Sequence, residues 1–173
     1  MTLPTQALLT ALSSCALCLV SPVTAAGAGP LKGNSYIIEL SSSQFSSGYG
    51  DYLLPPLIEV LERSEMTAAN GSGADVVVNI VTQSDVGQWI GQGDDRAWIY
   101  TFDITVGISP ESYLIPIDGT PVFGIRARLL TPNSDREDEL DCLIKLAART
   151  ALAQYRATGI FQTDGSSCLR KPG

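Results

Sequence analysis

The stretch 98–108 constrains the fold of this chain more than any other. Large apolar side chains occupy every second position in it, and Thr, Asp and Gly stand between them. Side chains of a β-strand alternate between two faces, so the pattern predicts a long strand with one buried and one wetter face. The stretch 122–129 alternates likewise, with Phe123 directed inward and Arg126 and Arg128 outward. The chain is therefore expected to build a sheet that is covered on one side.

Further strands and turns complete this sheet. Residues 36–40 form a short β-branched strand, and 75–82 are apolar on both faces, which is typical of a central strand. The glycine-rich stretch 91–95 predicts a turn that makes 83–90 and 96–108 the arms of a hairpin. Asp118-Gly119 predicts another turn, which would join a strand at 113–117 to 122–129.

Two stretches have helical spacing. In 51–63 the apolar residues recur at helical intervals, and Pro55 and Pro56 are assigned to the first turn, where proline is tolerated. The sequence Ser134-Asp135-Arg136-Glu137 fits a capping box at the start of a longer helix that runs to about residue 157. One apolar stripe follows along it: Leu140, Leu143, Ile144, Ala147, Ala151 and Tyr155.

These elements predict an α+β domain in the order β-α-β-β-(β)-β-α. The economical packing is a two-layer sandwich, a mostly antiparallel twisted sheet of about four or five strands with both helices on one face. The order is similar to that of several small bacterial envelope proteins and accessory lipoproteins, a resemblance of topology that assigns no function.

The first part of the chain has the features of a secretory signal. No residue from Met1 to Pro30 is charged, and an apolar core is followed by Pro22 and small residues up to Ala25. We predict a signal peptide at 1–25 and a single domain at 26–173, with less regular tails at 26–34 and 158–173. The mature chain is expected to have no transmembrane span, and to be periplasmic or secreted.

The same segment could instead be the signal of a lipoprotein. Leu12-Ser13-Ser14-Cys15 resembles the lipobox of bacterial lipoproteins. The resemblance implies acylation of Cys15 and an outer-membrane lipoprotein in place of a free one. The alternative remains open at this point.

The cysteines predict one disulfide. Cys15 and Cys18 leave with the signal, so the exported domain keeps Cys142 and Cys168, which can pair in only one way. The bridge would hold the C-terminal tail against the second helix and stabilise the fold by about 3 kcal/mol. Two free thiols are the alternative.

Charge and composition exclude several classes of function. The chain has 11 Lys and Arg against 18 Asp and Glu, a net charge of −7, which disfavours nucleic acid as a partner. It has no histidine, which excludes His zinc sites and Ser-His-Asp triads. No cofactor and no metal site are expected.

Acidic and hydroxyl groups give weak candidates for chemistry. Asp94-Asp95 is read as turn chemistry, and the run 135–141 as helix N-terminal charge, in preference to a carboxylate or calcium site. The serines lack a G-x-S-x-G elbow, and Asn70-Gly71-Ser72 would be a glycosylation site only in a eukaryotic host.

The candidate partner surface combines the outer face of the sheet with one loop. Arg126 and Arg128 share that face with Asp103, with which cross-strand pairing is the structural interpretation. The loop 41–50 adds Phe45 and Tyr49 among small polar residues. We expect a non-catalytic binding or accessory protein of the bacterial cell envelope, whose partner is a protein or another envelope component. The alternatives are a lipoprotein anchored through Cys15 and a hydrolase that uses acidic residues alone.

Overall fold

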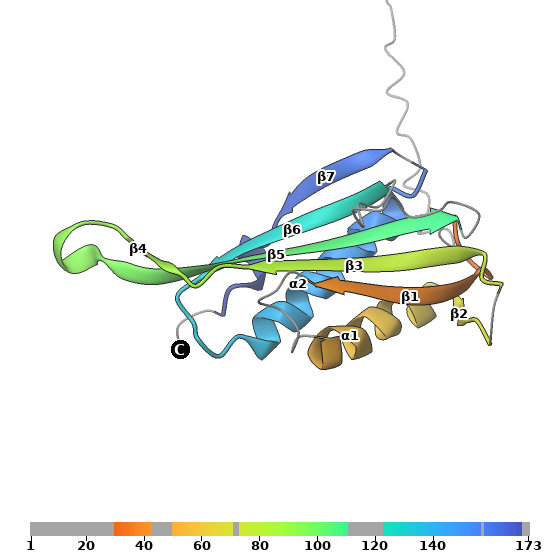
Figure 1. Ribbon diagram of the computed structural model, residues 1–173, viewed down its shortest axis with the longest axis horizontal. Helices are drawn as coiled ribbons and strands as arrows, with labels where there is room; N and C mark the ends of the chain where they lie inside the picture. Colours follow the sequence, from red (N-terminus) through yellow and green to blue (C-terminus); the bar gives the residue numbers. More distant parts are fainter. Residues whose placement is uncertain (1–29, 43–49, 71–72, 111–122, 157, 171–173) are drawn as a thin grey trace, which may run out of the picture.

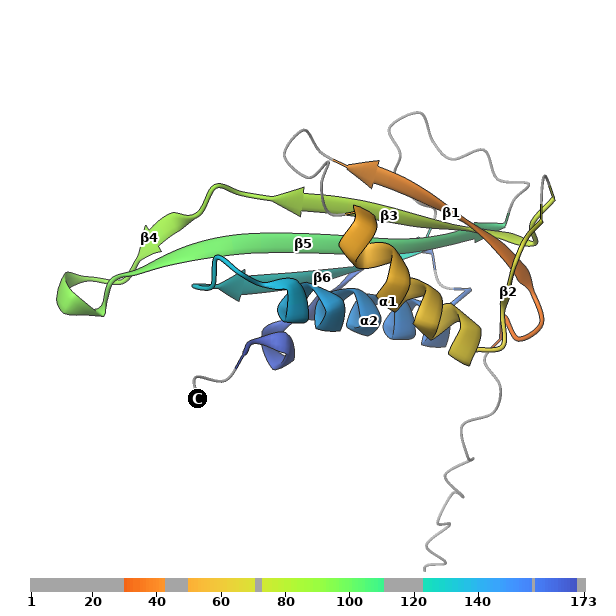
Figure 2. The ribbon, with the colours of Figure 1, turned by 90° about the horizontal axis from the view of Figure 1, so that it is seen from below.

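The computed structural model describes residues 30–42, 50–70, 73–110, 123–156 and 158–170. A twisted sheet forms one layer, and both helices lie on one of its faces (Figures 1 and 2). The elements in chain order are β1 (Ser35–Ser42), α1 (Gly50–Arg63), β2 (Thr67–Ala68), β3 (Val76–Ser84), β4 (Gln88–Ile90), the 3-10 turn η1 (Gly93–Asp95), β5 (Ala97–Pro110), β6 (Phe123–Thr131), α2 (Glu137–Ala153), β7 (Gly159–Asp164) and the 3-10 turn η2 (Ser166–Cys168).

Among the described residues the sheet has seven strands, ordered β2-β1-β3-β5-β6-β7, with β4 paired to β5 alone. Its centre is antiparallel, because β5 lies between β3 and β6 and runs opposite to both. At the margins β1 pairs with β3 and β7 pairs with β6 in parallel. The predicted α+β class and the two-layer packing are confirmed, and the sheet is larger and more mixed than predicted.

The core lies between the sheet and the helices. Cross-strand register places Ile80, Val106 and Ile125 in one buried row that faces the helices. Each fully buried aliphatic side chain of this kind stabilises the fold by about 1.5–3 kcal/mol. The helices contribute their apolar stripes, in which Leu53, Leu57, Leu61, Leu143, Ile144 and Ala147 are buried. At the helix–helix contact Lys145 forms ion pairs with Glu59 of α1 and Asp141 of its own helix, at 2.8 and 3.0 Å.

Both helices begin differently from the sequence prediction. In α2 the residue before the first turn is Arg136, and no side chain caps the helix, so the predicted capping box at Ser134 is wrong. Glu139, which stands in the first turn, is directed instead to Asn133 and Arg170. In α1 the two prolines lie inside the helix, beyond its first turn, since the helix begins at Gly50.

The C-terminal segment is more regular than predicted. Residues 159–164 form the edge strand β7 in place of an irregular tail, because β6 offers them a free edge for parallel pairing. After β7 the chain turns back to α2, where Cys142 and Cys168 form a disulfide with their Cα atoms 5.5 Å apart. The bridge joins the beginning of α2 to η2.

Several predicted features lie outside the described residues. They are the secretory signal at 1–25 with its Cys15 box, Phe45 and Tyr49 of the loop, and the strand at 113–117. No helix among the described residues is long and apolar enough to span a membrane.

Candidate interaction surface

The hairpin of β4 and β5 extends away from the body of the domain. We call residues 85–99 the arm; in Figures 1 and 2 it projects past the ends of the neighbouring strands and beyond both helices. The sequence predicted a hairpin here, but the outgoing strand is interrupted: β3 ends at Ser84, and β4 begins at Gln88. No member of the buried hydrophobic core belongs to the arm.

Asp85 fixes the arm at its base. Its carboxylate accepts hydrogen bonds from the amides of Gly87 (3.0 Å) and Thr101 (2.8 Å), and its own amide donates to the Thr101 carbonyl. Burial acts to raise the pKa of Asp85, but the hydrogen bonds from Thr101 and Gly87, with the charge of Arg136, hold that pKa below its usual value. Asp85 thus fixes the backbone between β3 and β4 by binding both Gly87 and Thr101.

One face of the arm carries both tryptophans of the chain. Trp89 and Trp98 are directly paired across the strands, and their rings meet edge to face with centroids 5.4 Å apart. The guanidinium of Arg96 lies over the Trp89 ring, 4.9 Å from its centroid. This combination of indoles and arginine is enriched in protein–protein interfaces.

The opposite face of the arm is apolar too. Register pairs Ile90 with Ala97 and Gln88 with Ile99, and these residues alternate with the tryptophans along the strands. The exposed fraction is 57% for Trp89, 42% for Ile90 and 76% for Val86. The arm thus exposes large apolar side chains on two sides, although it forms no part of the core.

The end of the arm is polar and acidic. The 3-10 turn η1 holds Asp94 and Asp95, both exposed, and neither belongs to an ion pair among the described residues. The predicted turn is present at this position, and the pair belongs to no group of three potential metal ligands among the described residues.

The predicted partner residues on the outer face are largely engaged with each other. Arg128 makes a bidentate ion pair with Asp103, at 2.8 and 2.9 Å, which is the cross-strand pair that the sequence predicts. The Arg126 Nε is 3.5 Å from the Thr105 hydroxyl. The structure therefore brings Arg126, Arg128 and Asp103 together on two adjacent strands. A role of this face in binding stays a prediction.

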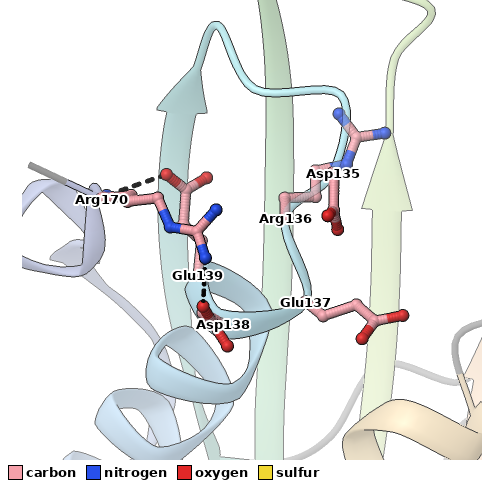
Figure 3. Close-up of a pocket in the computed structure, with 6 residues that line it drawn as sticks. All are labelled: Asp135, Arg136, Glu137, Asp138, Glu139 and Arg170. Atoms are coloured by element: carbon pink, nitrogen blue, oxygen red, sulfur yellow. Dashed lines mark hydrogen bonds and ion pairs between the residues drawn. The ribbon is translucent and has the colours of Figure 1, made fainter. Parts of the chain in front are cut away.

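A second candidate is a small pocket at the beginning of α2. Its volume is about 140 Å³, and Figure 3 shows four acids and two arginines around it: Asp135, Arg136, Glu137, Asp138, Glu139 and Arg170. Most of these groups hold the fold. Glu139 is 2% exposed and accepts hydrogen bonds from the Asn133 side chain and the Arg170 amide, while Asp138 pairs with the Arg170 guanidinium.

The arginine at the edge of this pocket is likewise committed to structure. Arg136 stacks on Tyr100 and Phe102 of β5, its guanidinium 4.5 and 4.0 Å from the two ring centroids. It therefore covers the strand just behind the arm. The pocket is best understood as the junction of α2, β5 and the C-terminal segment.

A hydrolase that uses acids alone would need a carboxyl group with a raised pKa in a cleft. In the described part of the chain, every carboxyl group with a shifted pKa is shifted downward. Lys145 lowers the pKa of Glu59, and hydrogen bonds from Ser35 and Ser166 lower those of Asp75 and Asp164. The geometry gives this alternative no support.

Neither sequence comparison finds a relative: no known family model and no curated protein matches the chain. The solved structures that match the chain in part include the following two. A minor lipoprotein from Acinetobacter baumannii is 15% identical, with a TM-score of 0.45 over 70% of this chain and 91% of that one. PelC from Paraburkholderia phytofirmans, solved as a dodecamer, is 12% identical, with a TM-score of 0.43 over 73% and 93%.

Proposed function

We propose that this chain is an exported, non-catalytic binding protein of the bacterial cell envelope, and that it engages its partner through the arm. The observation that carries the proposal is the exposure of Trp89, Ile90 and Val86 on an element that contributes nothing to the core. Large apolar side chains gathered on a projecting element mark sites of interaction.

The cost of such an arm supports this assignment. A lone two-stranded hairpin is at best marginally stable in water, and the ordered arm exposes apolar area that the fold does not need. Hydrogen bonds at Asp85 and the stacking of Arg96 on Trp89 hold it in shape. A preorganised arm loses little conformational entropy when it binds.

Export is supported by the N-terminal pattern and by the disulfide. Cys142–Cys168 is typical of a protein that folds in an oxidising compartment. The mature chain is proposed to begin at Ala26, and acylation of Cys15 is the alternative. Mass spectrometry of the mature protein separates the two: an N-terminus at Ala26 supports a free protein, whereas a diacylated Cys15 supports a tethered one.

The binding role is tested by mild cross-linking in intact producing cells. We compare the wild-type chain with a variant in which residues 87–99 are replaced by Asn-Gly, and with the double variant Arg126→Glu, Arg128→Glu. A cross-linked complex that is lost only without the arm supports the proposal. Loss only with the arginine variant would move the binding surface to the outer face of the sheet, and a complex that survives both changes would overturn both assignments.

A further inference from the structure

From the two faces and the end of the arm we infer the chemistry of its partner: a protein with a groove that has two apolar walls and a basic far end. The inference rests on the proposed binding role of the arm. To that role it adds the shape and the charge of the partner surface that the arm would fit.

Two apolar walls follow from the register of the hairpin. Trp89 and Trp98 stand on one face, and Ile90 stands on the other, since neighbouring residues of a strand point in opposite directions. A flat partner would cover one face and leave the other in water. A groove that receives the arm edgewise covers both.

The basic end follows from charge. Asp94 and Asp95 lie together at the end of the arm, exposed and outside any ion pair among the described residues, and the guanidinium of the neighbouring Arg96 lies over Trp89. Lys or Arg side chains at the far end of the groove would complement them. Complementary charges of this kind accelerate association and select the partner.

The same two acids argue against a lipid bilayer. An arm that enters a bilayer end first would carry both carboxylates toward the hydrocarbon, at about 2.5–3.5 kcal/mol for each charge at its centre. An arm that lies flat on the surface would bury only one of its two apolar faces. A bilayer therefore cannot cover both apolar faces of the arm and also leave Asp94 and Asp95 in water.

A second copy of this chain is also a poor receptor. The chain has a net charge of −7, and the pocket at the beginning of α2 has four acids against two arginines. A second copy would therefore meet Asp94 and Asp95 with mostly like charge, which disfavours the contact. The partner is accordingly a different protein.

The test places a photo-cross-linking amino acid at single positions of the full chain in the producing cells. Positions 89 and 90 sample the two faces of the arm, and positions 52 and 169 are exposed controls away from it. Each cross-linked peptide is identified by mass spectrometry. We expect positions 89 and 90 to label two different segments of one protein, and the controls to leave that protein unlabelled.

Charge variants complete the test. Asp94→Lys with Asp95→Lys should lower the cross-linking yield at both positions by about tenfold, and Asp94→Asn with Asp95→Asn should lower it less. Asp135→Lys with Glu137→Lys, which makes the same change of charge at two exposed acids at the start of α2, should leave the yield unchanged. The inference is overturned if only one face of the arm labels the partner, or if the labelled molecule is a second copy or a lipid. It is also overturned if the yield does not change in the lysine variants. In each of these cases the binding role of the arm stands. If the arm labels nothing, the binding role fails as well.

Discussion

Asp85 forms the hydrogen bonds at the base of the arm. Its carboxylate is the acceptor for two amides at the point where β3 stops and β4 begins. These hydrogen bonds need the charged form to be fully effective, because ionised acceptors bond more strongly than neutral ones. The arm should therefore respond to pH and to a single substitution at this position.

The pKa of Asp85 is lowered in the folded protein, so its contribution to stability is present above the unfolded pKa of about 3.9 and is lost as the pH falls through the folded value. We expect Asp85→Asn to loosen the arm at pH 7, and the difference from wild type to shrink below about pH 4. Tryptophan emission measures this, because both tryptophans lie in the arm. Asp94→Asn is the control; a difference independent of pH would contradict the role given to the charge.

Gly87 allows a second test at the same scale. Its φ is +85°, and an added Cβ would overlap the indole nitrogen of Trp98. Gly87→Ala is expected to displace Trp98 and alter the near-UV circular dichroism of the indole pair. Gly33→Ala is the matched control, with a φ of +82° and open space around the new Cβ. Equal effects of the two variants on the indole signal would show that the Trp98 contact is not the cause.

At the scale of elements, α2 organises the C-terminal segment. Its first turns hold η2 through Cys142–Cys168 and hold Arg170 through Glu139 and Asp138. Sequence reasoning found the disulfide, because two cysteines leave a single pairing. Sequence reasoning missed Glu139. The run of acids around it was interpreted as charge at the helix N-terminus, and nothing in the sequence pattern shows that Glu139 is the buried one.

Glu139→Ala should lower the free energy of unfolding by about 2–3 kcal/mol, because it leaves the Asn133 amide and the Arg170 N–H without their acceptor oxygen. Glu137→Ala, an exposed acid of the same turn, should change stability by less than about 0.5 kcal/mol. Urea unfolding followed by far-UV circular dichroism gives both values. Similar losses for the two variants would remove the special role of Glu139.

The double variant Cys142→Ser, Cys168→Ser should lose about 3 kcal/mol, as expected for a bridge across 26 residues of sequence. The measurement is urea unfolding of the variant beside the oxidised wild type. Wild-type protein assayed under reducing conditions should lose a similar amount. No difference between oxidised and reduced protein would show that packing alone holds the C-terminal segment.

For the molecule as a whole, the sequence was informative where apolar residues repeat along an element. Alternation in 98–108 and 122–129 predicted the central strands, and helical spacing predicted both helices. The wetter face predicted for 98–108 is wrong for the inner part of β5, because residues 102–109 are buried on both faces. β7 was missed because an exposed edge strand needs no apolar alternation, and its burial pattern has none. The arm was recognised only as a hairpin, since local pattern cannot tell how far a hairpin extends beyond its sheet.

Removing the arm should leave the rest of the molecule folded. The variant with Asn-Gly in place of 87–99 closes β3 onto β5 by a two-residue turn that suits a hairpin, and it loses no core residue. We expect its free energy of unfolding to stay within about 1 kcal/mol of wild type, measured by urea denaturation. A much larger loss would show that the arm supports the sheet, and would weaken its assignment to binding.

The bridge between α2 and η2 also limits how copies of the chain can associate. β7 is an edge strand at the C-terminal end of the fold, and strands so placed can be exchanged between identical chains. Here β7 lies between two residues that are covalently joined, Cys142 in the helix before it and Cys168 in the turn after it. The oxidised chain therefore keeps β7 on its own β6, and strand exchange at this edge is open only to the reduced protein.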